Sequence, residues 1–167
     1  MKTIPLNRGL AALIDDGDYE LVSQFRWHAN PRHAPGALVQ VFYARTREGR
    51  LMHRMIMAAL PGQPVDHADG DGLNNQRHNL RLCTTSQNNY NGRKRHDGKA
   101  SRFKGVQKKN GRWRAYIYRA GRTAHLGMFD TEEEAARAYD RMAVQLAGPF
   151  ARPNFPSPAQ DEGKPTT

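Results

Sequence analysis

The chain has 167 residues and a formal net charge of +10, with 26 Lys and Arg against 16 Asp and Glu. This balance favours polyanionic partners such as nucleic acid or an anionic membrane surface. The single cysteine, Cys83, excludes an intramolecular disulfide and a Cys-rich zinc site, so we expect a reducing, cytoplasmic setting. No apolar run approaches the roughly 18 residues of a membrane span, and residues 1–5 lack the apolar core of a secretory signal. We therefore expect neither membrane insertion nor export.

The positive charge is concentrated in one segment. Residues 92–126 hold twelve Lys and Arg and one acid, a net charge of +11, so the rest of the chain nets −1. Within this segment, residues 92–101 contain no large apolar residue, which is typical of a linker. We therefore predict two small domains, residues 1–91 and 102–156, joined by the basic linker 92–101. Residues 157–167 are predicted to be a disordered tail.

The first domain begins with short elements. Residues 3–50 mix short apolar runs with turn residues, which predicts short antiparallel strands and one helical turn near residues 19–25. From residue 51, apolar residues at 52, 55, 56, 59 and 60 follow one helix face, and Pro61 and Gly62 end that helix. Residues 65–67 and 80–83 are predicted to be two strands separated by a long polar loop, and Thr84, Thr85 and Ser86 offer N-caps for another helix.

The second domain shows a three-strand pattern. Residues 103–106, 112–118 and 123–129 are predicted to be strands, with turns at residues 110–111 and 120–121. Thr131 and Glu134 form a capping box, and the helix that it opens has an apolar stripe at residues 135, 136, 138, 139, 142, 143 and 146. This stripe is expected to pack on one face of the sheet. The predicted class is α+β.

Polar residues that can bind a metal or move a proton cluster between residues 66 and 91. Asp66 offers a hard oxygen ligand, and the adjacent His67 titrates near neutrality. Asn79 and Asn88 follow His67 by 12 and 21 positions. With this spacing, residues 51–91 resemble the HNH homing-endonuclease family, also called the ββα-metal nucleases. The matching stretches are residues 53–54, 65–70, 74–75, 79–81 and 86–89.

The resemblance implies a role for each matching residue. His67 would be the general base that deprotonates the attacking water, Asp66 and Asn88 would hold one divalent cation, and Asn79 would pin the loop that aims His67. The expected ion is Mg²⁺, with Mn²⁺ as the second candidate, because a carboxylate and an amide oxygen leave room for waters and phosphate oxygens. Zinc is not expected, since Asn88 stands where many relatives carry a histidine. No small-molecule cofactor is expected.

Residues 69–72 also resemble the start of a calcium loop. A calcium loop beginning at Asp69 would place Asn74 where Gly is needed and Leu80 where Glu is needed, so we reject it. His53 and Arg54 are as consistent with a solvated helix face as with a role at the site. Neighbours on a regular strand point to opposite faces, so Asp66 and His67 share a site only if the strand bends or ends there.

In the second domain, alternation on the strand from Arg112 separates two faces. Residues 113, 115 and 117 are predicted to face the helix, and residues 112, 114, 116 and 118 the other side. Residues 102–156 resemble the ethylene-response-factor domain of plant transcription factors, which also occurs in phage and bacterial HNH nucleases. The matching residues are 103–106, 113–117, 126–129, 131, 134–136, 138–140 and 154–156.

In that family the three-stranded sheet lies in the major groove of DNA. The positions implied to face DNA are Lys104, Gln107, Lys109, Arg112, Tyr116, Tyr118, Thr123 and His125, and alternation adds Arg114. Several residues of the plant family are replaced, among them Gln107, Tyr118 and His125, so the plant recognition sequence should not carry over. The alternative is a solvated basic surface.

The expected function is that of a homing-type, site-preferring, metal-dependent endonuclease that hydrolyses phosphodiester bonds of double-stranded DNA. It would act in a bacterial host or phage-infected cell, and as a monomer, which suggests nicking because one HNH centre cuts one strand at a time. A second hypothesis is a transcriptional regulator with an inactive HNH module, against which the four residues Asp66, His67, Asn79 and Asn88 argue. A nuclease directed at RNA ranks third, since no RNA-recognition motif is present.

Overall fold

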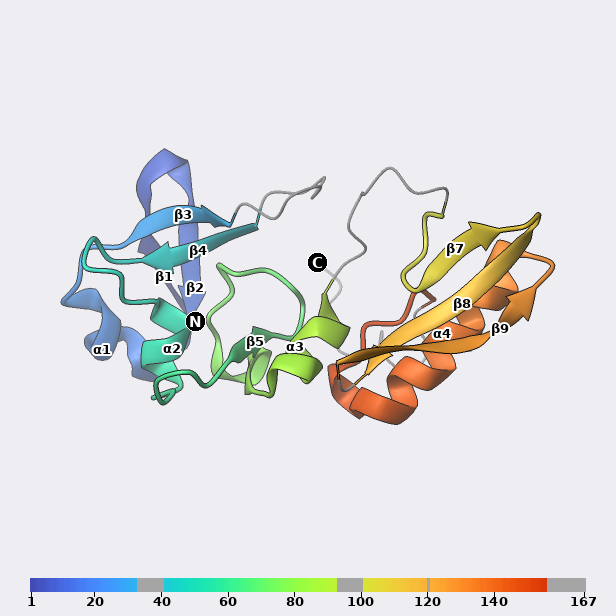
Figure 1. Cartoon of the computed structure of the whole chain (residues 1–167). Helices are drawn as coiled ribbons and strands as arrows, with labels where there is room; N and C mark the ends of the chain where they lie inside the picture. The colour runs from blue at the N-terminus through green and yellow to red at the C-terminus, as the bar shows by residue number, and fades with distance from the viewer. Residues whose placement is uncertain (33–40, 93–100, 120, 156–167) are drawn as a thin grey trace. The chain divides into compact units, whose positions relative to one another are not determined.

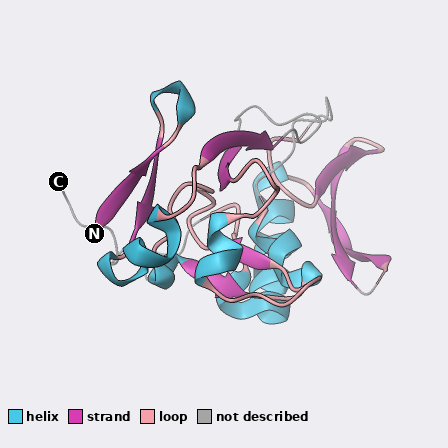
Figure 2. Cartoon of the chain, turned by 90° about the vertical axis from the view of Figure 1, so that its left-hand side faces the viewer, coloured by secondary structure: helices cyan, strands magenta, loops and turns pink. Residues whose placement is uncertain are grey.

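The computed structural model describes residues 1–32, 41–92, 101–119 and 121–155. The chain divides into two compact units, Met1–Asn88 and Asn89–Thr167. Most of the expected linker 92–101, the turn residue 120 and the expected tail 157–167 lie outside the described residues. The expected α+β class is confirmed, because short helices are mixed with small antiparallel sheets (Figures 1 and 2). None of the described helices is long and apolar enough to cross a bilayer.

The N-terminal unit consists of three two-stranded antiparallel sheets and short helices. Each sheet pairs two strands that follow each other along the chain, as the alternation of apolar runs and turns predicts. In chain order the elements are β1 (Lys2–Pro5), β2 (Ala11–Ile14), α1 (Tyr19–Ser23), β3 (His28–Arg32), β4 (Val41–Arg45), α2 (Met52–Ile56), β5 (Val65–His67), β6 (Leu80–Leu82) and α3 (Thr85–Asn91).

One hydrophobic core joins these small elements. Its buried members come from every sheet and from both α1 and α2, and Trp27 fixes its position by donating from Nε1 to the carbonyl of Val22 at 2.8 Å. Sheets of two strands are marginal alone, so this shared burial stabilises them together. The core residues are Ile4, Ala12, Ile14, Val22, Trp27, Ala44, Met52, Ile56 and Leu80.

The helix expected over residues 51–60 is shorter in the structure. α2 ends at Ile56, Ala58 has a positive φ of 46°, and Leu60 is 68% exposed. The guanidinium of Arg54 donates to the carbonyls of Leu60 and Gln63, which turns the chain after the helix. The apolar spacing at residues 59 and 60 therefore predicted too long a helix. The carbonyls after α2 accept hydrogen bonds from the Arg54 side chain, so the chain turns there and does not continue as a helix.

The C-terminal unit contains one antiparallel sheet with the strand order β7, β8, β9. These strands are Val106–Lys109, Arg112–Arg119 and Arg122–Phe129, and α4 (Glu132–Ala147) follows them. The first strand was expected at residues 103–106 and instead begins at Val106, because the positive φ of 68° at Gly105 breaks the extended chain. The turn at Asn110 and Gly111 is as expected, with both residues at positive φ.

The predicted capping box of α4 is confirmed. The Glu134 backbone N–H donates to Thr131 Oγ1 at 3.2 Å, and the Thr131 backbone N–H donates to Glu134 Oε2 at 3.2 Å. The apolar stripe of the helix shares two hydrophobic clusters with the strands. One contains Ile117 and Ala143, and the other contains Val106, Ala115 and Ala136.

Gly105 offers a test of this packing. A Cβ at Gly105 would lie 1.9 Å from the Tyr139 ring and 2.6 Å from the Tyr116 carbonyl oxygen, whereas Gly111 has a similar φ and nothing within 4 Å of its Cβ position. We expect Gly111→Ala to lower the free energy of unfolding by about 1 kcal/mol through backbone strain alone. Gly105→Ala should lower it at least twice as much, measured by urea unfolding followed by circular dichroism. Equal losses would contradict the packing of Tyr139 on Gly105.

Candidate functional site

His67 lies at the last position of β5, where the strand ends in a turn. The Gly70 backbone N–H donates to the His67 carbonyl at 2.9 Å, so the chain leaves the sheet directly after the histidine. The side chain is 4% exposed, and its Nε2 lies 3.4 Å from Asn75 Oδ1. Asn75 donates from Nδ2 to the Leu73 carbonyl at 3.1 Å, which directs its oxygen toward His67. With Asn75 in this orientation, the contact is a hydrogen bond in the tautomer that carries the proton on Nε2.

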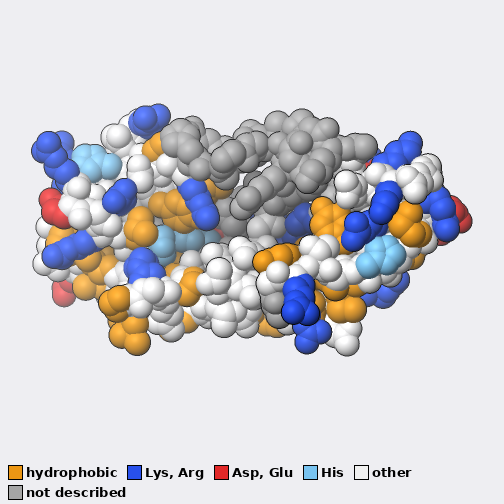
Figure 3. Space-filling model, viewed as in Figure 1, with side chains coloured by type: hydrophobic (Ala, Val, Ile, Leu, Met, Phe, Trp, Pro, Cys, Tyr) orange, Lys and Arg blue, Asp and Glu red, His pale blue; other side chains and the backbone are white. Residues whose placement is uncertain are grey.

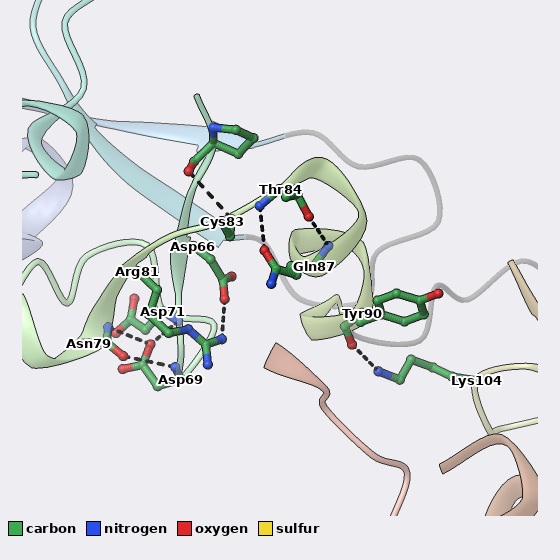
Figure 4. Close-up of polar contacts among 11 residues, drawn as sticks. Asp66, Asp69, Asp71, Asn79, Arg81, Cys83, Thr84, Gln87, Tyr90 and Lys104 are labelled. Atoms are coloured by element: carbon green, nitrogen blue, oxygen red, sulfur yellow. Dashed lines mark hydrogen bonds and ion pairs between the residues drawn. The ribbon is translucent and has the colours of Figure 1, made fainter. Parts of the chain in front are cut away.

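Asp66 precedes His67 on β5, and its carboxylate is near enough to oppose the fall that burial causes in the pKa of His67. It is 5% exposed and forms an ion pair with Arg81, the residue opposite it on β6 (Figure 4). The thiol of Cys83 lies close to the same carboxylate. Burial first and then the charge of Asp66 raise the pKa of Cys83, while Arg81 and a hydrogen bond from the Asn88 backbone N–H lower it. Cys83 therefore lies near both residues that were expected to hold the metal.

Asn88 is a half-buried residue of α3. Thr84 and Gln87 fix the start of that helix by a reciprocal cap, in which the Gln87 backbone N–H donates to Thr84 Oγ1 at 3.2 Å and the Thr84 backbone N–H to Gln87 Oε1 at 2.8 Å (Figure 4). The expected N-cap region is thus confirmed at Thr84. The cap sets the direction in which the first turn, including Asn88, leaves the strand.

Asn79 holds the loop between the two strands. It is 4% exposed, its Oδ1 accepts from the Asp69 backbone N–H at 3.0 Å, and its Nδ2 donates to Asp69 Oδ1 at 3.0 Å and to the Asn74 carbonyl at 2.8 Å (Figure 4). Asp69 Oδ1 also accepts from the Asp71 backbone N–H at 2.8 Å. The loop acids are therefore engaged in closing the loop on itself.

The N-terminal hairpin supports this loop from outside. β2 exchanges two backbone hydrogen bonds with it, from the Leu13 N–H to the Leu73 carbonyl and from the Asn75 N–H to the Leu13 carbonyl, both at 2.8 Å. Asp15 accepts from the Arg77 backbone N–H at 2.8 Å, and this bond is the main reason that the pKa of Asp15 is lowered. Asp18, which is 3% exposed, accepts from Arg77 Nε at 2.9 Å and from its Nη2 at 2.6 Å.

Two further aromatic rings pack against His67. The ring centroids lie 4.9 Å apart for His53 and His67, 5.6 Å for Tyr43 and His67, and 5.4 Å for Tyr43 and His53. His53 is 6% exposed, and its Nδ1 is buried without a hydrogen-bond partner, so its side chain does not lie on a solvated helix face. Burial, aided by the nearby His67 and Arg54, lowers the pKa of His53 to about 3.

Burial also lowers the pKa of His67. The hydrogen bond to Asn75 acts in the opposite direction, as do the carboxylates of Asp69, Asp66 and Asp71. The net shift is downward, so near neutral pH His67 is a neutral imidazole that can accept a proton.

The donors at the site are hard oxygen ligands. Among residues 1–32, 41–92, 101–119 and 121–155, no group of three His, Cys, Asp or Glu side chains is placed to hold a metal ion. An ion held by Asp66 and Asn88 would therefore complete its coordination with water or phosphate oxygens. A carboxylate and an amide with such oxygens fit a small hard cation.

Eight of the nine residues expected to face DNA lie on one face of the C-terminal sheet. Cross-strand partners share a face, and Gln107 pairs with Arg114, Lys109 with Arg112, Tyr116 with His125, and Tyr118 with Thr123. The opposite face carries the buried Val106, Ala115 and Ile117. A register shift between Ala115 and Tyr116 gives β9 an extra residue and keeps His125 opposite Tyr116.

Two cations of this set have partners within the unit. Arg112 donates from Nε to Asp130 Oδ1 at 2.9 Å in an exposed ion pair. Lys104 lies before β7, and its ammonium donates to the carbonyls of Tyr90 at 3.1 Å, Gly92 at 2.9 Å and Arg152. Burial lowers the pKa of Lys104 to about 8. The contact of Lys104 with DNA stays a prediction, and in this structure its ammonium is engaged with three carbonyls of its own unit.

Four contacts of the site were not expected from the sequence. Asn75 lies in a stretch that matches the family but has no role assigned from the sequence, and the pattern around His53 fits a solvated helix face as well as the site. Arg81 had a usable signal, since pairing the two predicted strands places it opposite Asp66. Tyr43 had no such signal, because the sequence around it does not indicate that the loop of His67 packs on its ring.

The buried His53 makes stability depend on pH. In the unfolded chain it binds a proton with a pKa near 6.5, but in the folded chain only near 3, so acid favours the unfolded state. This histidine should lower the free energy of unfolding by about 1.4 kcal/mol per pH unit as the pH falls from 6 toward 4. Urea unfolding at several pH values should show a shallower acid slope for His53→Phe, which keeps a ring, than for the wild type. The exposed His78 provides the control, His78→Phe, whose slope should equal that of the wild type.

Comparison with known proteins identifies both parts of the chain. The HNH endonuclease family matches residues 50–90. An uncharacterized HNH endonuclease of Acanthamoeba polyphaga mimivirus is 31% identical over 150 residues, which cover 88% of this chain and 76% of the viral protein. The C-terminal part is similar to plant regulators. The AP2-like ethylene-responsive transcription factor TOE2 of Arabidopsis thaliana is 46% identical over 59 residues, and the ethylene-responsive transcription factor ERF084 of the same plant is 54% identical over 63.

The plant matches cover 34% and 36% of this chain but only 12% and 25% of the plant proteins, so they concern one domain. The viral match extends over most of both chains, and the matched family region contains Asp66, His67, Asn79 and Asn88. The chain therefore belongs to the HNH endonuclease family and is a nuclease with a C-terminal part of the AP2 and ethylene-response-factor type.

Proposed function

We propose that the protein is a homing-type, site-preferring endonuclease that uses a divalent metal to hydrolyse phosphodiester bonds of double-stranded DNA. The observation that carries this proposal is the buried, neutral His67 at the end of β5, whose proton is held on Nε2 by Asn75. A neutral imidazole with a fixed tautomer is the form that a general base requires. β5, β6 and α3 would then form the ββα-metal motif of the family.

In this mechanism His67 accepts the proton of the water that attacks the scissile phosphate. Nδ1 is the accepting atom, since Nε2 already carries a proton toward Asn75. Tyr43 and His53 pack on the ring and keep the bulk of the imidazole away from solvent. Asn79 acts one step further away, because it fixes the loop from which Asn75 reaches the histidine.

Asp66 and Asn88 are the residues that would hold the metal, and Mg²⁺ is the ion that their oxygens suit best. Once bound, a divalent cation offsets charge on the phosphate and on the leaving 3′ oxygen. Arg81 positions the carboxylate of Asp66 from the neighbouring strand. The reciprocal cap at Thr84 positions Asn88.

The C-terminal sheet would provide most of the sequence preference. Its open face interleaves basic and aromatic side chains, and the Arg114 guanidinium lies 5.8 Å over the Tyr116 ring. Such a surface contacts phosphates and base edges at the same time. One HNH centre per chain implies that a monomer nicks one strand.

The catalytic assignment predicts a selective loss of activity. In the full chain, His67→Ala, Asp66→Ala and Asn88→Ala should each lower the rate of Mg²⁺-dependent nicking of supercoiled plasmid at least a hundredfold. The circular dichroism spectrum should stay unchanged. Excess chelator should abolish the wild-type activity, and His78→Ala should leave it intact. For the wild type, the nicking rate should rise with pH as the proton leaves His67, with a midpoint below 6.5 because burial lowers this pKa. Full nicking by His67→Ala would overturn the mechanism.

The binding assignment predicts a change in salt dependence. Each cation that neutralises a phosphate of duplex DNA contributes about 0.9 to the slope of log affinity against log salt. Measured by fluorescence anisotropy in the His67→Ala background, Lys109→Ala and Arg114→Ala should each flatten this slope by about one unit if they touch phosphate. The matched control is Arg141→Ala, which removes an exposed arginine from α4, on the other side of the sheet. The same flattening in all three variants would indicate a diffuse charge effect and contradict a specific face.

A further inference from the structure

The cations of the N-terminal unit are unevenly distributed. Residues 26–50 contain five arginines and one acid, whereas the rest of residues 1–91 contains five Lys and Arg and seven acids. Among the latter cations, Arg77 and Arg81 are paired with Asp18 and Asp66, and Arg54 binds backbone carbonyls. Apart from Arg8, the arginines of this unit that are not engaged in such contacts therefore lie in residues 26–50.

That segment includes the β3–β4 hairpin, which has two different faces. Ala29 and Ala44 are opposite each other in the pairing and are buried, at 4% and 0% exposed. The other face carries Arg32, Tyr43 and Arg45, and we call these three residues the arginine ribbon. Arg32 and Arg45 are exposed, and no carboxylate of the described residues lies within 4 Å of either guanidinium to form a salt bridge.

The arginine ribbon adjoins the catalytic histidine. Its central residue, Tyr43, packs on His67 with ring centroids 5.6 Å apart, and Arg32 donates from Nη1 to the Tyr43 hydroxyl at 3.4 Å. The loop between β5 and β6 packs closely on β4. A Cβ at Gly72 would lie 2.3 Å from the Phe42 carbonyl oxygen and 2.8 Å from the Tyr43 ring. The ribbon, the loop and His67 thus form one packed body within the unit.

A basic pocket continues this surface. It lies at the end of the hairpin where His28 pairs with Arg45, and three further arginines, Arg26, Arg47 and Arg50, contribute to its lining beside the acid Glu48. In Figure 3, blue Lys and Arg side chains appear over the N-terminal unit around pale-blue histidine atoms. The pocket and the arginine ribbon therefore meet where His28 pairs with Arg45.

We propose that the arginine ribbon is a second DNA-binding surface, which holds the duplex beside the scissile phosphate independently of the C-terminal sheet. A two-stranded antiparallel ribbon fits the major groove of B-form DNA, and guanidinium groups bind phosphate with paired hydrogen bonds. The low net charge of residues 1–91 does not argue against this, because the acids are concentrated in the catalytic loop and around α1. The inference rests on the proposed endonuclease function and adds the surface that seats its substrate.

The test compares single charge removals in the full chain. Arg32→Gln and Arg45→Gln are set against Lys2→Gln, which removes an exposed cation from β1 of the same unit, and against Arg45→Lys, which keeps the charge. In the His67→Ala background, each Arg→Gln variant should flatten the salt slope of duplex DNA binding by about one unit, while Lys2→Gln and Arg45→Lys keep the wild-type slope. With His67 present, each Arg→Gln variant should also lower kcat/KM for plasmid nicking about tenfold. Circular dichroism confirms that the variants are folded.

Several results would overturn the inference. Wild-type salt slopes for both Arg→Gln variants would do so, as would an equal loss in Lys2→Gln. A loss of binding to phosphatidylserine vesicles or to duplex RNA, with duplex DNA binding unchanged, would assign the ribbon to another partner. Absence of nicking by the wild-type protein would instead remove the endonuclease proposal, and the binding arm would still decide whether the ribbon holds DNA.

Discussion

The hydrogen bond between Asn75 and His67 is the contact on which the rest of the site depends. Asn75 is fully buried, so each polar atom of its amide needs a partner, and the Leu73 carbonyl and the His67 imidazole provide them. This requirement fixes the tautomer of the histidine. An unsatisfied buried amide costs about 1–3 kcal/mol, so the loop is held strongly in the conformation that aims His67.

The position of Asn75 is determined in turn by the N-terminal hairpin. Its backbone N–H donates to Leu13 of β2, and the residues that follow it are bound by the carboxylates of Asp15 and Asp18. A long polar loop has little apolar surface to bury, so it needs such fixed partners to keep one conformation. The first 18 residues therefore hold the loop between β5 and β6 in place, although they lie some fifty residues before it in the sequence.

The sequence predicted those features that depend on local patterns. The order of strand, loop, strand and helix around residues 65–91, the hairpin turn at Asn110 and the cap at Thr131 follow from residue spacing and turn chemistry, and the structure contains them. The errors occurred where tertiary contacts decide. Arg54 ended α2 by binding carbonyls beyond it, and the positive φ of Gly105, which packs on Tyr139, delayed the start of β7 to Val106.

The same distinction applies to the site. Spacing relative to His67 singled out Asp66, Asn79 and Asn88, but their roles remain proposals, because each role depends on which atoms converge on the phosphate. Tyr43 had no signal, and the matching stretch at His53 did not decide between the site and a solvated helix face, since packing of two rings on a histidine depends on how distant segments meet.

The net charge of a domain does not show where its cations and acids lie or which of them are paired. Residues 1–91 carry a net charge of only +2, yet five of their ten Lys and Arg lie in residues 26–50, which contain a single acid. Three of the other acids are bound within the fold. Asp69 accepts a hydrogen bond from Asn79 that closes the loop, Asp18 pairs with Arg77, and Asp66 pairs with Arg81. Once these internal pairs are formed, the exposed arginines of the β3–β4 hairpin are not offset by them. The proposed DNA surface on the hairpin is therefore compatible with the low net charge of the unit, because the carboxylates of the loop and of β5 are engaged with other partners.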